Sequence, residues 1–265
     1  MPFKINGYLG KQVEGILEDN YTNHKQVFKT CEEINRYAQQ LKSKFNINSL
    51  DRQGVFSTIL YLKIHNAFQG AVIMYKHGLN SEAKVITRTG LEFLFILKAI
   101  VKDEKNCDKL FEADDKNREL LLKNINYDKN NIFSELANKV DLRDYYKLKS
   151  KNKDNNVKKL KIKQWAELSD SLIDYNYAYY YLCGEVHVDL RSFEKYVETD
   201  EEGQITQFNP LPSTKDINLI MFTASHCMLG AIEAMSRLKK FDNEHEIKEI
   251  SDLVLSIKDM DIEIE

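Results

Sequence analysis

Apolar residues recur every three or four positions along most of the chain, which is the period of an amphipathic α-helix. The first clear run consists of Val27, Cys31, Ile34, Ala38 and Leu41. A second run, from Phe56 to Tyr75, ends at "KHGLNSEA". In that stretch we expect Gly78 to adopt a left-handed conformation that ends the helix and Ser81 to act as the N-cap of the next one. The pattern therefore predicts a helical hairpin.

The helix that begins at Ser81 is nearly apolar from Leu91 to Val101, so we expect it at the centre of a bundle. Further helices are expected at about 105–124 and 129–140, from Gln164 onward, at about 214–240 and in "NEHEIKEISDLVLSI". The stretch "FEKYVETDEEGQITQFNP" alternates and turns at "DEEG". The sequence thus predicts an all-α fold, a multi-helix bundle of about seven to nine helices with a small hairpin or irregular insertion near 192–210. We expect residues 1–265 to form a single helical domain.

Proline content supports long helices. The three prolines are Pro2, Pro210 and Pro212, so residues 3–209 contain none that would interrupt a helix.

Composition narrows the class of protein. With 265 residues, 43% hydrophobic and 30% charged, the chain has the profile of a soluble globular protein. No uninterrupted apolar run approaches twenty residues and no signal peptide is recognisable, so we expect a cytoplasmic protein with no membrane partner. The net charge of -3 excludes a globally basic nucleic-acid binder but leaves room for a local basic patch. The four cysteines are far apart, which predicts reduced and mostly buried thiols.

The stretch "KLKSKNKDNNVKKLKIK" is rich in lysine. It places seven lysines between Lys149 and Lys163 against one acidic residue, Asp154. Two interpretations are open, a solvated mobile loop and a patch that contacts phosphates. Because no aromatic residue is interleaved there to stack on bases, the loop is favoured.

Two polar pairs are the candidates for chemistry. Arg88 and Glu92 are four residues apart, so on a helix they share a face and can pair, and His187 and Arg191 repeat that spacing. We expect the two pairs to face each other. Histidine can transfer a proton near neutral pH, arginine can neutralise a phosphate, and glutamate can orient the imidazole. The predicted catalytic residues are therefore His187, Arg88, Glu92 and Arg191, with Tyr179 and Tyr180 as substrate-binding residues.

A structural interpretation of the same residues stays open. In it they form a buried hydrogen-bonded network that sets helix register, and removal of one partner costs roughly 3–5 kcal/mol. A metal site built from Glu92, Glu185, His187 and Asp189 is less favoured, because positions 185, 187 and 189 cannot share one helical face. Common nucleotide-binding and hydrolase motifs are absent from the sequence. We expect neither a metal nor a cofactor.

Two segments carry a family resemblance. The first is "YKHGLNSEAKVITRTGLEFLF", with Gly78, Ala83, Arg88 and Glu92. The second is "YYYLCGEVHVDL", with Tyr179, Cys183 and His187. Together they resemble bacterial helical proteins grouped as domain-of-unknown-function family 5677, over about residues 55–235. The resemblance implies an all-α fold and a shared polar signature of Arg88, Glu92 and His187, and it brings no established activity.

The chain also has the general look of the HEPN superfamily, which includes RNA-cleaving toxins and phage-defence effectors. In those proteins four to six residues separate an arginine from the histidine that follows it, and this spacing is missing here. Arg88 has no histidine in range, Arg191 follows His187, and seven residues separate Arg237 from His245. Two hypotheses result. One is a metal-independent RNase or phosphotransfer effector of a phage-defence or toxin system, which acts on RNA or a nucleotide as a homo-oligomer. The other is a non-enzymatic binding or scaffold module in which the cluster is structural.

Overall fold

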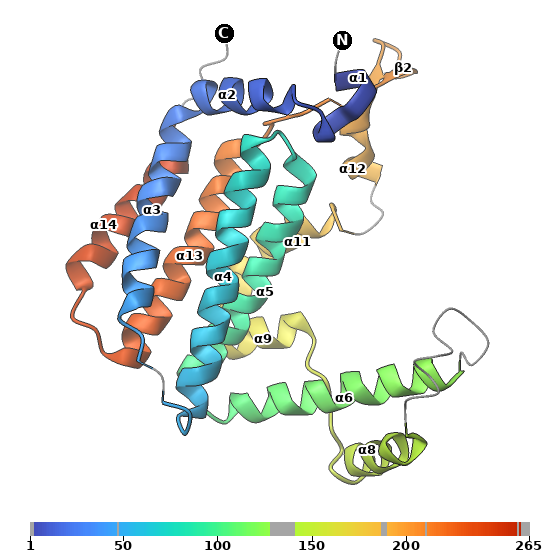
Figure 1. The fold of residues 1–265 in the computed structure, drawn as a ribbon, viewed down its shortest axis with the longest axis vertical. Helices are drawn as coiled ribbons and strands as arrows, with labels where there is room; N and C mark the ends of the chain where they lie inside the picture. The colour runs from blue at the N-terminus through green and yellow to red at the C-terminus, as the bar shows by residue number, and fades with distance from the viewer. Residues whose placement is uncertain are drawn as a thin grey trace.

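The computed structural model describes residues 3–46, 48–127, 141–186, 190–209, 211–258 and 260. The chain is helical through most of this range (Figure 1). Its longer helices, of seven residues or more, are α2 (Val13–Asn23), α3 (Lys25–Ser43), α4 (Arg52–Lys76), α5 (Asn80–Lys102), α6 (Asn106–Tyr127), α8 (Leu142–Asp154), α9 (Ile162–Leu168), α13 (Ile217–Lys239) and α14 (Glu244–Lys258). Nine helices of this length within the described residues confirm the predicted all-α bundle.

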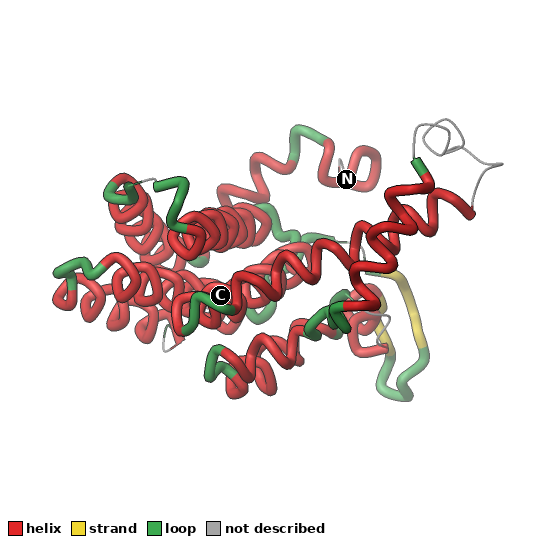
Figure 2. Tube along the Cα trace, turned by 90° about the horizontal axis from the view of Figure 1, so that it is seen from below, coloured by secondary structure: helices red, strands yellow, loops and turns green. Residues whose placement is uncertain are grey.

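Shorter elements connect these helices. They are α1 (Phe3–Asn6), the 3-10 helix η1 (Gly7–Leu9), α10 (Leu172–Asp174), the π-helix η2 (Tyr175–Tyr179), α11 (Tyr180–Cys183), α12 (Leu190–Phe193) and the 3-10 helix η3 (Glu194–Tyr196). The two strands β1 (Val197–Thr199) and β2 (Ile205–Phe208) pair antiparallel, with Val197 opposite Phe208. They are the yellow segments of Figure 2 and confirm the hairpin predicted near 192–210.

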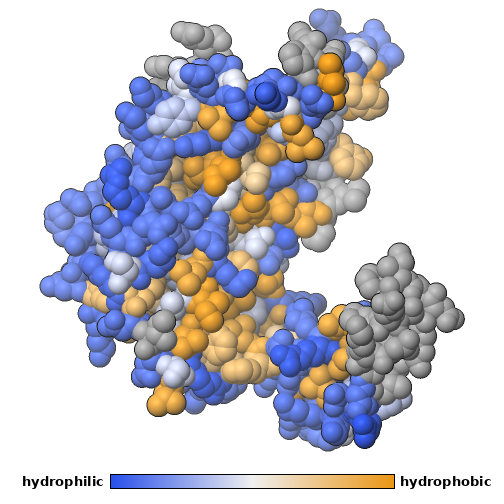
Figure 3. Space-filling view, in the orientation of Figure 1, coloured by the Kyte–Doolittle hydropathy of each residue, from blue (hydrophilic) through white to orange (hydrophobic). Residues whose placement is uncertain are grey.

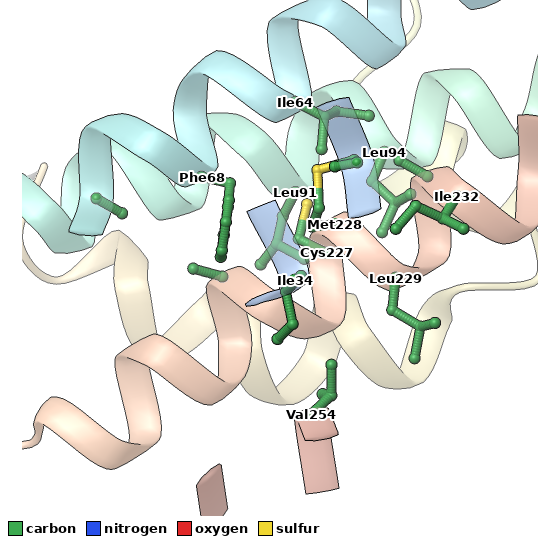
Figure 4. Packing of buried hydrophobic residues seen from close by; sticks show 14 of the residues in the cluster. Ile34, Ile64, Phe68, Leu91, Leu94, Cys227, Met228, Leu229, Ile232 and Val254 are labelled. Atoms are coloured by element: carbon green, nitrogen blue, oxygen red, sulfur yellow. The ribbon is translucent and has the colours of Figure 1, made fainter. Parts of the chain in front are cut away.

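The core lies where α3, α4, α5, α13 and α14 meet (Figure 4). Helix α13 packs against both α4 and α5, and α14 packs against α13 and α3. Leu91 and Leu94 of α5 and Ile232 of α13 are fully buried. Gly230 permits the close approach of α13 to α5, since a Cβ there would lie 3.2 Å from both terminal methyl carbons of Leu94. The apolar face predicted for α3 is buried along its whole length, as expected.

The turn between α4 and α5 agrees only in part with the prediction. Gly78 has a φ of +72°, as expected for a left-handed helix end. The N-cap of α5 is Leu79, however, so the assignment of Ser81 as N-cap is wrong. Ser81 lies inside the first turn, where its hydroxyl accepts a hydrogen bond from Lys195. The helix begins early because tertiary contacts hold the turn, including a 2.9 Å hydrogen bond from the Ser213 N–H to the Gly78 carbonyl.

The segment 164–190, called the tyrosine-rich segment below, is predicted as one long helix from Gln164 onward, but the described part of it is broken into α9, α10, η2 and α11. After α9 the chain breaks at 169–171, where Asp170 has a φ of +56°. The hydroxyls of Ser169 and Ser171 donate to the nearby carbonyls of Ala166 and Ser169. Such local side-chain bonds compete with helical hydrogen bonding, which accounts for the break.

Helices α6 and α8 form an arm, a name used below for residues 106–127 together with 141–163. The two helices pack against each other and extend away from the lower end of the bundle in Figure 1. Residues 149–154 belong to α8, so the prediction of a loop through the lysine-rich stretch is wrong for this half. The helix expected at 129–140 lies outside the described residues.

Hydrophobic side chains gather over α4 and α5 on the face turned to the reader in Figure 3. Two isoleucines of α4, Ile59 and Ile73, are among the exposed large hydrophobic residues of the chain. This face is open to solvent in the single chain.

Among the described helices, α13 is the one long and apolar enough to span a membrane by length and composition. Within its most apolar window, 78% is buried inside the bundle, which is the pattern of a core helix.

Candidate functional site

A polar stripe runs along one side of α5. It consists of Lys84, Arg88, Glu92, Lys98 and Lys102. The stripe faces the chain from α9 to α11 and the residues just after it. Lys84 contacts Glu185, and both Arg88 and Glu92 contact Tyr179. Lys98 contacts Ser171, and Lys102 contacts Asp170. The residue number of the partner decreases as the residue number along α5 increases, so the two segments run antiparallel.

Arg88, Glu92 and Tyr179 form a closed cluster in the middle of this stripe. Nη2 of Arg88 lies 2.9 Å from Oε1 of Glu92, which confirms the predicted pair. The same Nη2 donates to the Tyr179 hydroxyl oxygen at 2.7 Å, and that hydroxyl donates to Oε1 of Glu92 at 3.0 Å. The guanidinium carbon also lies 4.9 Å from the centre of the Tyr179 ring. Three side chains thus bind one another across two segments.

Burial and charge keep Tyr179 and Arg88 protonated near neutral pH. Burial and the negative charge of Glu92 raise the pKa of Tyr179, so its hydroxyl stays protonated. Burial opposes the positive charge of Arg88, but the Cys183 thiol and Glu92 outweigh it, and the pKa of Arg88 is raised. The arrangement is an ion pair with a tyrosine bridge, suited to holding η2 against α5.

The turn that presents Tyr179 is unusual. Residues Tyr175–Tyr179 are π-helical, and the rings of Tyr175 and Tyr179 stack with centroids 5.1 Å apart. Single π-helical turns often mark functional sites, because the wider turn shifts the side chains that follow it.

A cavity of about 860 Å³ lies beside this cluster. Its walls come from the first turns of α5, from α11 and the residues after it, from 190–195, and from the chain leading into α13. Tyr180, predicted as substrate-binding, lines the cavity, as do Tyr181 and Cys183. Arg88, Glu92 and Tyr179 are not part of the lining.

Charged groups occupy the centre of the cavity wall. Lys84 is only 7% exposed, and its Nζ lies 3.3 Å from Glu185 and 3.4 Å from Asp216. Lys195 reaches Oε2 of Glu185 at 2.5 Å and also donates to the Ser81 hydroxyl. Two ammonium groups therefore share the carboxylate of Glu185.

The pKa values of these groups shift toward the charged forms. Burial alone raises the pKa of Glu185, but Lys195 and Lys84 outweigh it and lower that pKa. Burial alone lowers the pKa of Lys84, but Tyr181, Glu185 and Asp216 outweigh it and raise that pKa. The cavity wall is zwitterionic at neutral pH.

Asn80 in the same wall carries an unpaired acceptor. Its Nδ2 donates to the Lys215 carbonyl at 2.5 Å, and the side chain is almost fully buried. Its Oδ1 is buried with no hydrogen-bond partner among the described residues. Unpaired buried acceptors are uncommon in native proteins, and this oxygen is enclosed by protein rather than exposed to the cavity.

The described residues therefore include only part of the site that the sequence predicts. Arg88, Glu92 and Tyr179 come together, and Tyr180 lies on the cavity wall. His187 and the side chain of Arg191 lie outside the described residues, so their roles stay predictions. Residues of the cavity wall that sequence reasoning missed include Asn80, Lys84, Lys195 and Asp216. A usable signal existed for Lys84 alone, which precedes Arg88 by one helical turn on the same face.

No group of three or more His, Cys, Asp or Glu side chains with metal-binding proximity occurs in the part of the chain that the structure describes. The expectation of a metal-free site stays a prediction.

Comparison with known proteins gives one match. A model described as "Family of unknown function (DUF5677)" matches residues 54–205, from α4 into β2, which is more than half of the chain. No curated protein and no solved structure matches. The match begins where the resemblance predicted and ends before α13, so it contains Lys84, Arg88, Glu92 and Tyr179 but not Asp216. The chain belongs to the family of unknown function DUF5677.

Proposed function

We propose that the protein binds RNA or a nucleotide in the cavity beside α5 and acts on its phosphodiester without a metal. The observation that carries this proposal is the cavity wall itself. It combines two ammonium groups, Lys84 and Lys195, with the exposed rings of Tyr180 and Tyr181.

Each part of the wall suits a part of a nucleotide. Lys84 and Lys195 are held close together by Glu185, and ammonium groups form short, strong hydrogen bonds to phosphate oxygens. The exposed rings of Tyr180 and Tyr181 offer surfaces on which a base stacks.

His187 is the proposed general acid or base, because an imidazole titrates near neutral pH. Glu185 and Leu190, two residues before it and three after it in the sequence, line the cavity. Arg191 is the proposed additional phosphate contact. Arg88 and Glu92 act as positioning residues in this scheme, since their bonds to Tyr179 tie η2, which leads directly into α11, to α5.

A non-enzymatic binding module is the second candidate, and one observation favours it. Arg88, Glu92 and Tyr179 bind one another, and Glu185 already neutralises Lys84 and Lys195. Such closed pairing is expected of groups that set the packing of helices. In this case the cavity binds its ligand without catalysing a reaction on it.

Induced expression in a bacterial host separates the two candidates. Wild type, His187→Ala and the matched control His245→Ala are compared at equal soluble levels and equal Tm, with growth and total RNA integrity followed. His245 is strongly exposed on α14, so its removal leaves the site intact. The enzymatic proposal expects growth arrest and RNA degradation with wild type and His245→Ala but not with His187→Ala. Harmless expression of all three contradicts it.

Direct binding tests the cavity. A short fluorescent RNA is titrated against wild type and Lys195→Ala, whose side chain is partly exposed and can be removed without opening the core. The proposal expects weaker binding by the variant. Equal binding contradicts the assignment of the cavity as the ligand site. Bacterial origin, a defence or toxin context and the homo-oligomer stay predictions.

A further inference from the structure

The outer surface of the arm carries the strongest local charge in the described chain. Residues 142–163 contain nine lysines and arginines against two aspartates, although the whole chain has a net charge of -3. Every one of these lysines is exposed. Helix α8 and the loop that follows it therefore form a basic surface on a generally acidic protein.

Most of this charge is not neutralised within the protein. Lys151 pairs with Asp115 of α6 at 2.6 Å, and Arg143 pairs with Asp141. The ammonium group of Lys159 donates to the side chain of Asn117. Within the described residues, no hydrogen bond or ion pair engages the ammonium groups of the other six lysines, which are Lys147, Lys149, Lys153, Lys158, Lys161 and Lys163. These ammonium groups are available to an external anion.

An exposed aromatic side chain, that of Tyr146, lies on α8 next to these lysines. Tyr146 is 61% exposed, and Lys149 and Lys153 follow it at three and seven residues on the same face of α8. Tyr145 is buried against the arm and holds Tyr146 in an edge-to-face contact with centroids 5.1 Å apart. The ammonium of Lys149 lies 5.6 Å from the Tyr145 ring centre. The face thus presents an exposed ring followed by two lysines on the same side of the helix.

We infer that this face of α8, made of Tyr146, Lys149 and Lys153 and continued by the lysines of 158–163, is a docking surface for single-stranded RNA. Cations spaced along a surface follow a phosphate backbone, and an exposed aromatic ring stacks a base. The choice of RNA rests on the proposed function. The choice of a single strand rests on Tyr146, because the bases of a duplex are not free to stack on a side chain.

The arm is suited to this partner rather than to an anionic membrane. A helix that lies on a membrane inserts an exposed apolar face between the lipid headgroups. The apolar side of α8 instead packs on α6, where Tyr145 and Asn152 are buried. The exposed residues of α8 are mainly polar, and its lysines outnumber its two aspartates, Asp144 and Asp154.

Fluorescence anisotropy with a labelled single-stranded 2′-O-methyl RNA tests the inference, because the blocked 2′-hydroxyl prevents cleavage during the titration. The variants are Lys149→Glu with Lys153→Glu, and Tyr146→Ala. The control of equal charge change is Lys29→Glu with Lys248→Glu, which alters exposed lysines on α3 and α14. Each protein is titrated at several salt concentrations.

We expect the arm double variant to bind at least about tenfold more weakly than the control. Its log affinity should also depend less steeply on log salt, by about 0.7 for each phosphate that the variant no longer neutralises. Tyr146→Ala should weaken binding about fivefold with an unchanged salt slope. Equal affinity of the arm double variant and the control overturns the inference. So does binding of vesicles containing phosphatidylserine that is stronger than RNA binding and insensitive to Tyr146→Ala.

The failure of this inference and that of the proposed function are distinguishable. If wild type degrades RNA but the arm variants bind it as the control does, the arm assignment alone is wrong. If the arm variants fail to bind RNA while wild type degrades no RNA, the docking surface stands and the proposed reaction is wrong.

Discussion

Helix α5 meets the rest of the protein through two faces of opposite chemistry. One face is apolar, with Leu91, Leu94 and Phe95 fully buried. Gly230 of α13 comes close enough on this side to touch the methyl groups of Leu94. The other face is the polar stripe, which meets the tyrosine-rich segment through ion pairs and hydroxyl bridges. The same helix is therefore held by close packing on one side and by a few directional contacts on the other.

The apolar face of α5 contributes mainly to stability, whereas the polar stripe leaves side chains that can change partners. Close packing of apolar groups tolerates little change of volume, and many neighbouring atoms fix the position of each side chain. A charged group is stabilised only while its partner is present, and it is left stranded when the partner is removed. Accordingly the cavity borders the polar stripe, where side chains can exchange internal partners for those of a ligand.

The largest expected effect is on the apolar face. Leu94→Ala should lower the free energy of unfolding by about 3 kcal/mol, because it removes a fully buried side chain and leaves a cavity beside Gly230. Urea denaturation measures the change. The control is Leu255→Ala, at an exposed leucine of α14, which should cost less than about 0.5 kcal/mol. Similar costs for the two variants would contradict the assignment of Leu94 to the core.

A smaller effect is expected at the buried end of the polar stripe. Lys84→Met should lower the free energy of unfolding by about 2 kcal/mol. This is less than the cost of removing one partner from a buried ion pair that has no other counter-ion, because Lys195 still neutralises Glu185 in the variant. Chemical denaturation again gives the value. Lys102→Met changes a lysine at the exposed end of the same stripe and should cost less than about 0.5 kcal/mol. If Lys84→Met proves as mild as Lys102→Met, the charge network contributes little to folding.

The pH dependence of stability tests Glu185 separately. Its two lysine partners lower its pKa in the folded protein below the usual 4.5. Its stabilising contribution is therefore present above pH 4.5 and is lost as the pH falls through the lower folded pKa. Wild type should lose more stability than Glu185→Gln over this acidic range, measured by Tm against pH. Parallel pH profiles would show that Glu185 does not gain its partners on folding.

The smallest of these effects concerns one hydroxyl. Tyr179→Phe keeps the ring beneath Arg88 but removes the bridge to Glu92, and it should cost about 1 kcal/mol. Tyr177→Phe is the matched control, since that side chain is well exposed, and it should be nearly neutral. Differential scanning calorimetry of the two variants gives the comparison. A neutral Tyr179→Phe would mean that Arg88 and Glu92 hold each other without help.

Periodicity alone predicted most of the bundle. The apolar faces of α3, α4, α5 and α13 and the terminal helix α14 all lie where three-and-four spacing places them. The Arg88–Glu92 pair was equally predictable, because a pair four residues apart depends on nothing but the local helix. The small hairpin followed from alternation and a turn signal.

Other features depended on context that no short window of sequence contains. The break at 169–171 and the early start of α5 arise where side chains and distant backbone groups compete with helical hydrogen bonding. The first half of the lysine-rich stretch is helical because the other side of α8 packs on α6. Like charges in sequence suggested a loop, and burial of the opposite side outweighed them.

The sequence by itself determined the helical class, the apolar faces and the local Arg88–Glu92 pair, since these follow from spacings within a few turns. Tertiary structure alone decided the cavity, because Lys84 meets Glu185 across 101 positions and Asp216 across 132. It also decided which side of α8 faces outward. Contacts of that separation are set by how whole helices pack, and the driving force for packing is the burial of apolar faces, which carries no information about the polar groups it brings together.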